Sequence, residues 1–197
     1  MVHNWVLYIA AFASAFAISM VATPFAKKVS EKLGAIDYPK ARGMHTKPMP
    51  RLGGIAIVMG FMITVLLLYR FVNDINIKHF TGFIAGAVVI VCVGIVDDVK
   101  QLPARVKLVF QIVAALLVIG SGIRINVVMW PVTAYLQKLS GPITLIWIIG
   151  VTNAVNLIDG LDGLAAGVSS IASICLMVLC ILTGTESAVM FTAALAG

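Results

Sequence analysis

Long apolar stretches alternate with short polar ones along the whole chain. The apolar segments cover residues 5–25, 53–69, 80–96, 106–120, 141–157, 163–183 and about 187 to the end. Several approach the roughly 20 residues that a helix needs to cross the hydrocarbon core of a bilayer. They also lack the alternation of polar and apolar positions found in membrane β-barrels. The pattern therefore predicts an all-α polytopic membrane protein with about seven transmembrane segments in one domain, residues 1–197.

The composition supports the same fold class. Hydrophobic residues make up 61% of the chain and charged residues 11%, whereas soluble domains carry about 25% charged residues. A water-soluble domain is therefore excluded, and we expect the bilayer, not a nucleic acid, as the surrounding partner.

Lysine and arginine are distributed unequally between the two sides of the predicted membrane domain. The loop 26–51 and the stretch after the third segment carry ten of them, and the opposite side carries four. Basic loops remain in the cytoplasm, so we expect the N-terminus outside and the basic loops on the cytoplasmic side. This rule alone accounts for the net charge of +6, although the same side chains would also attract anionic lipid or nucleotide phosphates.

Three polar stretches fall on the predicted cytoplasmic side, and the first is the loop 34–54. Its prolines prevent a continuous helix, and Gly53 and Gly54 allow close backbone approach where the second segment begins. A basic linker explains the Lys and Arg residues of this loop but explains His45 poorly. Both a linker and a substrate-binding loop stay open for residues 34–54.

The second polar stretch contains two adjacent carboxylates, Asp97 and Asp98, at the end of the third segment. Unpaired carbonyls give that end of a helix a partial negative charge, which disfavours carboxylates. Pairing with nearby bases at the surface would contribute at most about 1 kcal/mol. The alternative is that the carboxylates face a cation or act on a phosphate group, with Lys107 facing the same cavity.

The third stretch, residues 152–167, places Asn153, Asn156, Asp159 and Asp162 at intervals of three. In a helix such residues lie along one side. Their oxygen atoms suit Mg²⁺ or Mn²⁺, although a purely structural polar cluster is the alternative. All three stretches meet the same membrane face, so we expect one shallow cytoplasmic site open to a soluble nucleotide and to a lipid.

Three motifs now point to a family. HTKPMPRLGG (45–54), VDDVKQLPARVKLVFQ (96–111) and NAVNLIDGLDGLAAG (153–167) resemble the polyprenyl-phosphate N-acetylhexosamine-1-phosphate transferases, which include MraY, WecA and TagO. The Pro-Arg pair of the first motif resembles the WecA/TagO branch more than MraY.

The resemblance implies a reaction and a set of residues. The phosphate of undecaprenyl phosphate would attack the β-phosphorus of a UDP-N-acetylhexosamine, such as UDP-GlcNAc, with Mg²⁺ as cofactor and UMP as leaving group. The product would enter a cell-wall glycopolymer such as teichoic acid. Carried over by position, the resemblance implies a catalytic pair, Asp97 and Asp98, a metal-associated Asn156, and substrate-binding residues His45, Arg51, Lys107, Asn153, Asp159 and Asp162.

The end of the sequence departs from the family pattern. Family members continue with a Gly-Asp segment that supplies a metal ligand and with a His-bearing loop, whereas this sequence ends inside an apolar segment. We therefore expect it to be the N-terminal portion of a longer protein. An MraY-like transferase for UDP-MurNAc-pentapeptide, an inactive truncated homologue and a small ion-coupled transporter are the alternatives. A homodimer is compatible with the family.

Overall fold

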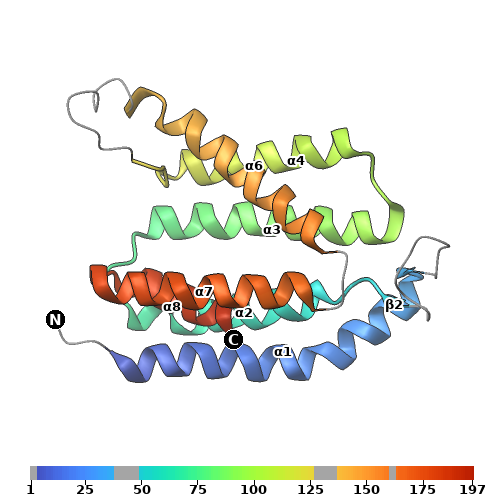
Figure 1. Ribbon diagram of the computed structural model, residues 1–197, viewed down its shortest axis with the longest axis horizontal. Helices are drawn as coiled ribbons and strands as arrows, with labels where there is room; N and C mark the ends of the chain where they lie inside the picture. Colours follow the sequence, from blue (N-terminus) through green and yellow to red (C-terminus); the bar gives the residue numbers. More distant parts are fainter. Residues whose placement is uncertain (1–3, 38–48, 127–136, 160–162) are drawn as a thin grey trace. The chain divides into compact units, whose positions relative to one another are not determined.

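The computed structural model of the chain is almost entirely helical (Figure 1). It describes residues 4–37, 49–126, 137–159 and 163–197. The elements in chain order are α1 (Trp5–Leu33), β1 (Ile36–Asp37), β2 (Met49–Pro50), α2 (Gly54–Leu68), the 3₁₀ turn η1 (Tyr69–Phe71), α3 (Ile77–Lys100), α4 (Ala104–Gly120), α6 (Ser140–Ile158), α7 (Leu164–Thr183) and α8 (Glu186–Ala196). The predicted all-α class is confirmed.

Membrane insertion is supported by both the length and the surface of the helices. Five of the described spans are long and apolar enough to cross a bilayer, namely α1, α2 with η1, α3, α6 and α7. Large apolar side chains such as Val6, Leu157 and Leu182 are 79%, 84% and 75% exposed, which suits lipid and not water. The polytopic membrane fold is confirmed, whereas the count of seven segments stays a prediction, because α4 has 17 residues and α8 has 11.

The chain forms two compact units. Unit 1 comprises Met1–Ile75 and Gly160–Gly197, and unit 2 comprises Asn76–Asp159. In unit 1, α2 approaches α1 closely at Gly60, where an added Cβ would lie 2.7 Å from the carbonyl oxygen of Ala15. A hydroxyl pair, Ser14 and Thr64, joins the same helices at 3.2 Å. Small residues at a helix interface permit this close packing inside a membrane.

The first helix is longer than its apolar segment predicts. It continues from residue 25 through Leu33, because lysine and glutamate are good helix formers outside the apolar region. It ends at Gly34, whose φ of 68° is the left-handed conformation that commonly terminates helices. The two short strands follow, paired antiparallel with Ile36 opposite Pro50.

Unit 2 contains α3, α4 and α6. The hairpin of α3 and α4 packs tightly at Gly86, where a Cβ would lie 3.0 Å from the carbonyl oxygen of Ala114. At the other end of α4, Ile125 N donates to Thr144 Oγ1 at 2.8 Å, and Ser140 Oγ donates to the Ile125 carbonyl at 2.7 Å. These bonds attach the chain after α4 to the start of α6.

Candidate active site at the ends of α3, α4 and α6

A turn of three residues between α3 and α4 positions the first candidate carboxylate. Helix α3 continues past the apolar segment to Lys100, so Asp97 and Asp98 lie in its last turn. Gln101 ends the helix with a φ of 50°, and its N–H donates to the Asp97 carbonyl at 2.7 Å. The Asp97 side chain accepts a second bond from the Leu102 N–H, at 2.8 Å from Oδ1. The carboxylate therefore holds the turn that leads into α4.

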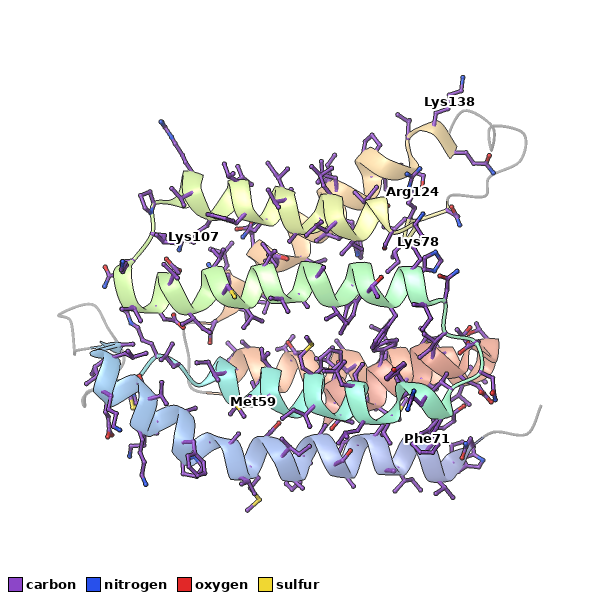
Figure 2. All side chains as sticks on the ribbon, turned by 180° about the vertical axis from the view of Figure 1, so that it is seen from behind. Met59, Phe71, Lys78, Lys107, Arg124 and Lys138 are labelled. Carbon is purple, nitrogen blue, oxygen red and sulfur yellow. The ribbon has the colours of Figure 1, made fainter. Side chains whose placement is uncertain are left out.

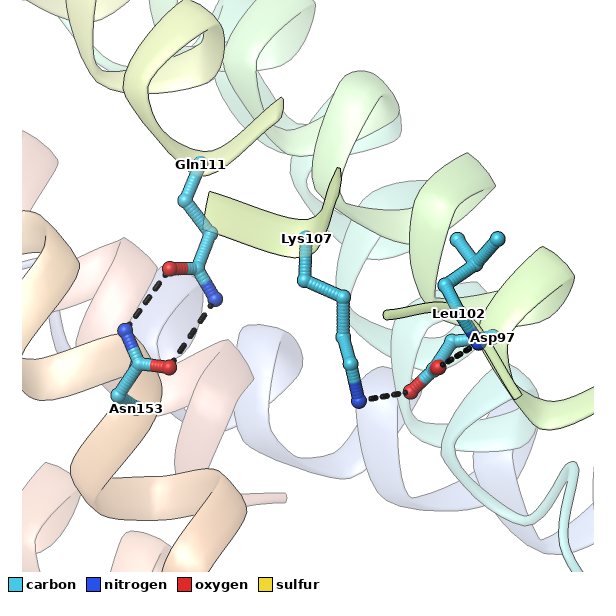
Figure 3. Close-up of polar contacts among 5 residues, drawn as sticks. All are labelled: Asp97, Leu102, Lys107, Gln111 and Asn153. Atoms are coloured by element: carbon cyan, nitrogen blue, oxygen red, sulfur yellow. Dashed lines mark hydrogen bonds and ion pairs between the residues drawn. The ribbon is translucent and has the colours of Figure 1, made fainter. Parts of the chain in front are cut away.

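Lys107 approaches the same carboxylate from the first turn of α4. Its Nζ lies 2.8 Å from Asp97 Oδ2 (Figure 3). The two side chains are 32% and 22% exposed, so water still reaches the pair and its contribution to stability is modest. The ammonium does offset negative charge at the C-terminal end of α3. The ion pair is the pairing with a nearby base that the sequence allowed for Asp97, and the expectation that Lys107 faces a shared substrate cavity stays a prediction.

Asp98 differs from Asp97 in direction. Successive residues of a helix are rotated by roughly 100° about its axis, so the two carboxylates leave α3 on different sides. Asp98 is half-buried. Asp97 is the acid that binds the turn and Lys107.

Helix α6 supplies the amide and acidic row. Asn153 is half-buried and pairs with Gln111 of α4, while Asn156 and Asp159 are exposed. The helix ends at Ile158, and Asp159 is its C-cap residue, with its N–H bonded to the Val155 carbonyl at 3.1 Å. The predicted row is therefore helical through Asn156 and reaches Asp159 at the helix end.

These side chains gather at one end of unit 2. The end of α3, the start of α4 and the end of α6 lie together there (Figure 1). Lys107 lies at this end, whereas Lys78, Arg124 and Lys138 lie at the opposite end (Figure 2). This arrangement brings carboxylate, ammonium and amide groups from three helices to one end of unit 2.

The first motif is described only in part. His45 and Asp162 lie outside the described residues. Arg51 belongs to unit 1 and follows β2 directly. Its N–H donates to the Ala35 carbonyl at 3.0 Å, and its side chain is half-buried. The backbone of Arg51 is therefore fixed by the small sheet.

Gln111 is a buried polar residue near the candidate site that the sequence motifs did not single out. It lies in the apolar helix α4, four residues after Lys107, and is only 9% exposed. A glutamine buried in a membrane helix requires a hydrogen-bond partner. That isolated amide was the available signal, but its partner is 42 residues away.

The oxygen donors at this end fit a magnesium ion only with help from substrate. The part of the chain that the structure describes contains no group of three or more His, Cys, Asp or Glu side chains arranged to hold a metal. Asp97 is already bonded to Lys107 and Leu102. The exposed oxygens of Asn156 and Asp159 remain, and Mg²⁺ commonly combines one or two protein oxygens with waters and substrate phosphates.

Comparison with known proteins places the chain in a family. The family "Glycosyl transferase family 4" matches residues 80–197, which include most of α3, all of α4 and α6, and the two later motifs. The chain belongs to glycosyl transferase family 4. This match confirms, at the level of the family, the resemblance to the polyprenyl-phosphate hexosamine-1-phosphate transferases.

Curated relatives of this family 4 chain include three from different bacteria. A probable undecaprenyl-phosphate N-acetylglucosaminyl 1-phosphate transferase of Bacillus subtilis is 36% identical over 148 residues, covering 74% of this chain and 40% of the relative. A decaprenyl-phosphate N-acetylglucosaminephosphotransferase of Mycobacterium tuberculosis is 33% identical, covering 58% and 30%. An undecaprenyl-phosphate alpha-N-acetylglucosaminyl 1-phosphate transferase of Escherichia coli is 31% identical, covering 44% and 22%.

The chain spans less than half the length of these curated relatives. No solved structure matches it significantly.

Proposed function

We propose that this protein transfers N-acetylglucosamine-1-phosphate from UDP-GlcNAc to undecaprenyl phosphate. A phosphate oxygen of the lipid attacks the β-phosphorus of the donor, the bond to the α-phosphate oxygen breaks, and UMP leaves. Membership of glycosyl transferase family 4, with relatives named for N-acetylglucosamine phosphate transfer to polyprenyl phosphates, carries this proposal. The proximity of Lys107 to Asp97 at one end of unit 2 supports it.

The residues of this site act through position and charge, which dominate catalysis of phosphoryl transfer. Lys107 binds substrate phosphate, and Asp97 holds its ammonium in place through the 2.8 Å contact. Asp98 orients the lipid phosphate. Asp159, exposed at the end of α6, contacts the nucleotide. His45, Arg51 and Asp162 belong to the same proposal as substrate-binding residues.

Magnesium is part of the proposal, with Mn²⁺ as a substitute. Asn156 and Asp159 would hold the ion together with substrate phosphates, since both are exposed oxygen donors near the end of α6. When bound, the ion supplies positive charge that stabilises the diphosphate and the departing UMP. The protein groups themselves hold and orient the reacting phosphates.

The proposed function is tested by UMP release. The protein as the cell makes it, purified in detergent with undecaprenyl phosphate, is expected to release UMP from UDP-GlcNAc. UDP-MurNAc-pentapeptide, the donor of the MraY-like alternative, is expected to be at least about tenfold poorer in kcat/KM, because discrimination follows contacts to the sugar. Preference for the pentapeptide donor would favour the alternative. Release of no UMP from either donor would contradict a transferase.

The proposed orientation has its own test. Lys100 and Lys78 are exposed and lie at opposite ends of α3. In a background with Cys92, Cys175 and Cys180 replaced by alanine, K100C is expected to react with an impermeant maleimide only from the cytoplasmic side. K78C is the matched control and is expected to react only from outside. The reverse pattern would invert the topology and move the proposed site to the wrong side for UDP-GlcNAc.

A further inference from the structure

The amide pair between Gln111 and Asn153 connects α4 to α6 near the candidate site (Figure 3). Asn153 Nδ2 donates to Gln111 Oε1 at 2.8 Å, and Gln111 Nε2 donates back to Asn153 Oδ1 at 3.4 Å. The second hydrogen of Asn153 Nδ2 goes to the Ile149 carbonyl at 2.8 Å. Both amide hydrogens of Asn153 are therefore engaged within the protein.

We propose that Gln111 and Asn153 are positioning residues that set the register of α6 against α4 for catalysis. This inference rests on the proposed function. It assigns Asn153 to helix positioning in place of donation to substrate, because a substrate oxygen would have to displace one of the two bonds that the Asn153 amide nitrogen already donates.

The amide pair lies about one helical turn from a candidate site residue on each of the two helices. Gln111 follows Lys107 by four residues, about 6 Å along α4, and lies on the same side of the helix. Asn153 precedes Asn156 by three residues, about 4.5 Å along α6. Helix α4 begins at the candidate site and α6 ends there. Lys107 on α4 and Asn156 on α6 therefore each lie about one helical turn from the amide pair.

The Gln111–Asn153 amide pair depends on the register of α6 against α4. The neighbours of Asn153 on α6 include Val151 and Val155, which are 46% and 41% exposed and apolar. Both valines are two residues from Asn153 and so lie on the other side of α6, whereas the amide pair is a directional contact between α4 and α6 whose geometry depends on their register. A slip of one residue would move Asn156 by about 1.5 Å relative to Lys107.

A reciprocal exchange of the two side chains tests the pair. Q111N shortens one side and N153Q lengthens the other, while the Q111N/N153Q double variant keeps the summed length. Each single variant is expected to lower kcat for UMP release by about ten- to a hundredfold, with KM for UDP-GlcNAc within about twofold. The double variant is expected to recover most of kcat.

A control separates positioning from general stability. T144V removes the hydroxyl that bonds Ile125 N at the other end of α6. It is expected to lower the midpoint of thermal unfolding in detergent while kcat per folded enzyme stays unchanged. If kcat fell in T144V as much as in Q111N and N153Q, the amide pair would be only one of several structural contacts and the inference would be overturned.

The remaining outcomes are also decisive. A higher KM in N153Q that Q111N does not correct would place Asn153 on the substrate and overturn the inference. If the unmodified protein releases no UMP, the proposed function fails separately. The unfolding midpoints of the single and double variants then test the link between α4 and α6. If the double variant does not recover the midpoint lost in the single variants, the inference is rejected.

Discussion

Replacing Asp98 with asparagine is expected to lower UMP release by about 10³-fold or more, because a charged group that orients the reacting phosphate contributes on that scale. The substitution keeps the size of the side chain and removes its charge. Asp97 holds the turn after α3, and the midpoint of thermal unfolding, measured beside the rate, separates any structural cost of D98N from the loss of turnover. Initial rates with saturating UDP-GlcNAc and undecaprenyl phosphate measure the loss.

Asp97 provides the matched comparison for Asp98. D97N retains one side-chain oxygen for Leu102 N but loses the ion pair with Lys107. It is expected to destabilise the protein by about 1 kcal/mol and to lower kcat less than D98N does. Near-normal turnover in D98N together with loss of turnover in D97N would exchange the two roles. Normal turnover in both variants would remove the acidic pair from the reaction.

Removal of divalent metal is the second prediction with a large effect. Excess EDTA is expected to abolish UMP release, because the Lys107 ammonium, already paired with Asp97, does not by itself neutralise a diphosphate and its leaving group. Adding Mg²⁺ beyond the chelator should restore the rate, and Mn²⁺ should restore part of it.

A variant of Asn156 makes the metal prediction specific to this site. N156A is expected to raise the Mg²⁺ concentration required for half-maximal rate, whereas T144V, at the far end of α6, should leave it unchanged. Full activity in excess EDTA would reject the proposed cofactor. An unchanged Mg²⁺ requirement in N156A would remove that residue from the metal site.

The helices were predictable wherever apolar residues alone determine them. The windows 80–96 and 141–157 lie inside α3 and α6, because burying backbone groups in lipid requires a helix. The ends were less predictable. Helix α3 extends to Lys100 and α1 to Leu33, since polar residues beyond the bilayer continue a helix until a left-handed residue such as Gly34 ends it.

The candidate site was predictable where its residues are close in sequence. Asp97 and Lys107 are ten residues apart, and one tight turn between antiparallel helices is enough to join them. The spacing of three in the third polar stretch singled out Asn156 and Asp159, and the family resemblance assigned their roles. Gln111 was not found, because its partner Asn153 lies on a helix that is separate in sequence.

The sequence by itself determined that this is a helical membrane protein of glycosyl transferase family 4, with acids and amides at the ends of its helices. Hydrophobic length and motif order suffice for those conclusions. The tertiary structure decided which groups engage one another: Asp97 with Lys107 and Leu102, and Asn153 with Gln111. Such pairings depend on the rotation and register of packed helices, and apolar periodicity in a membrane segment leaves both undetermined.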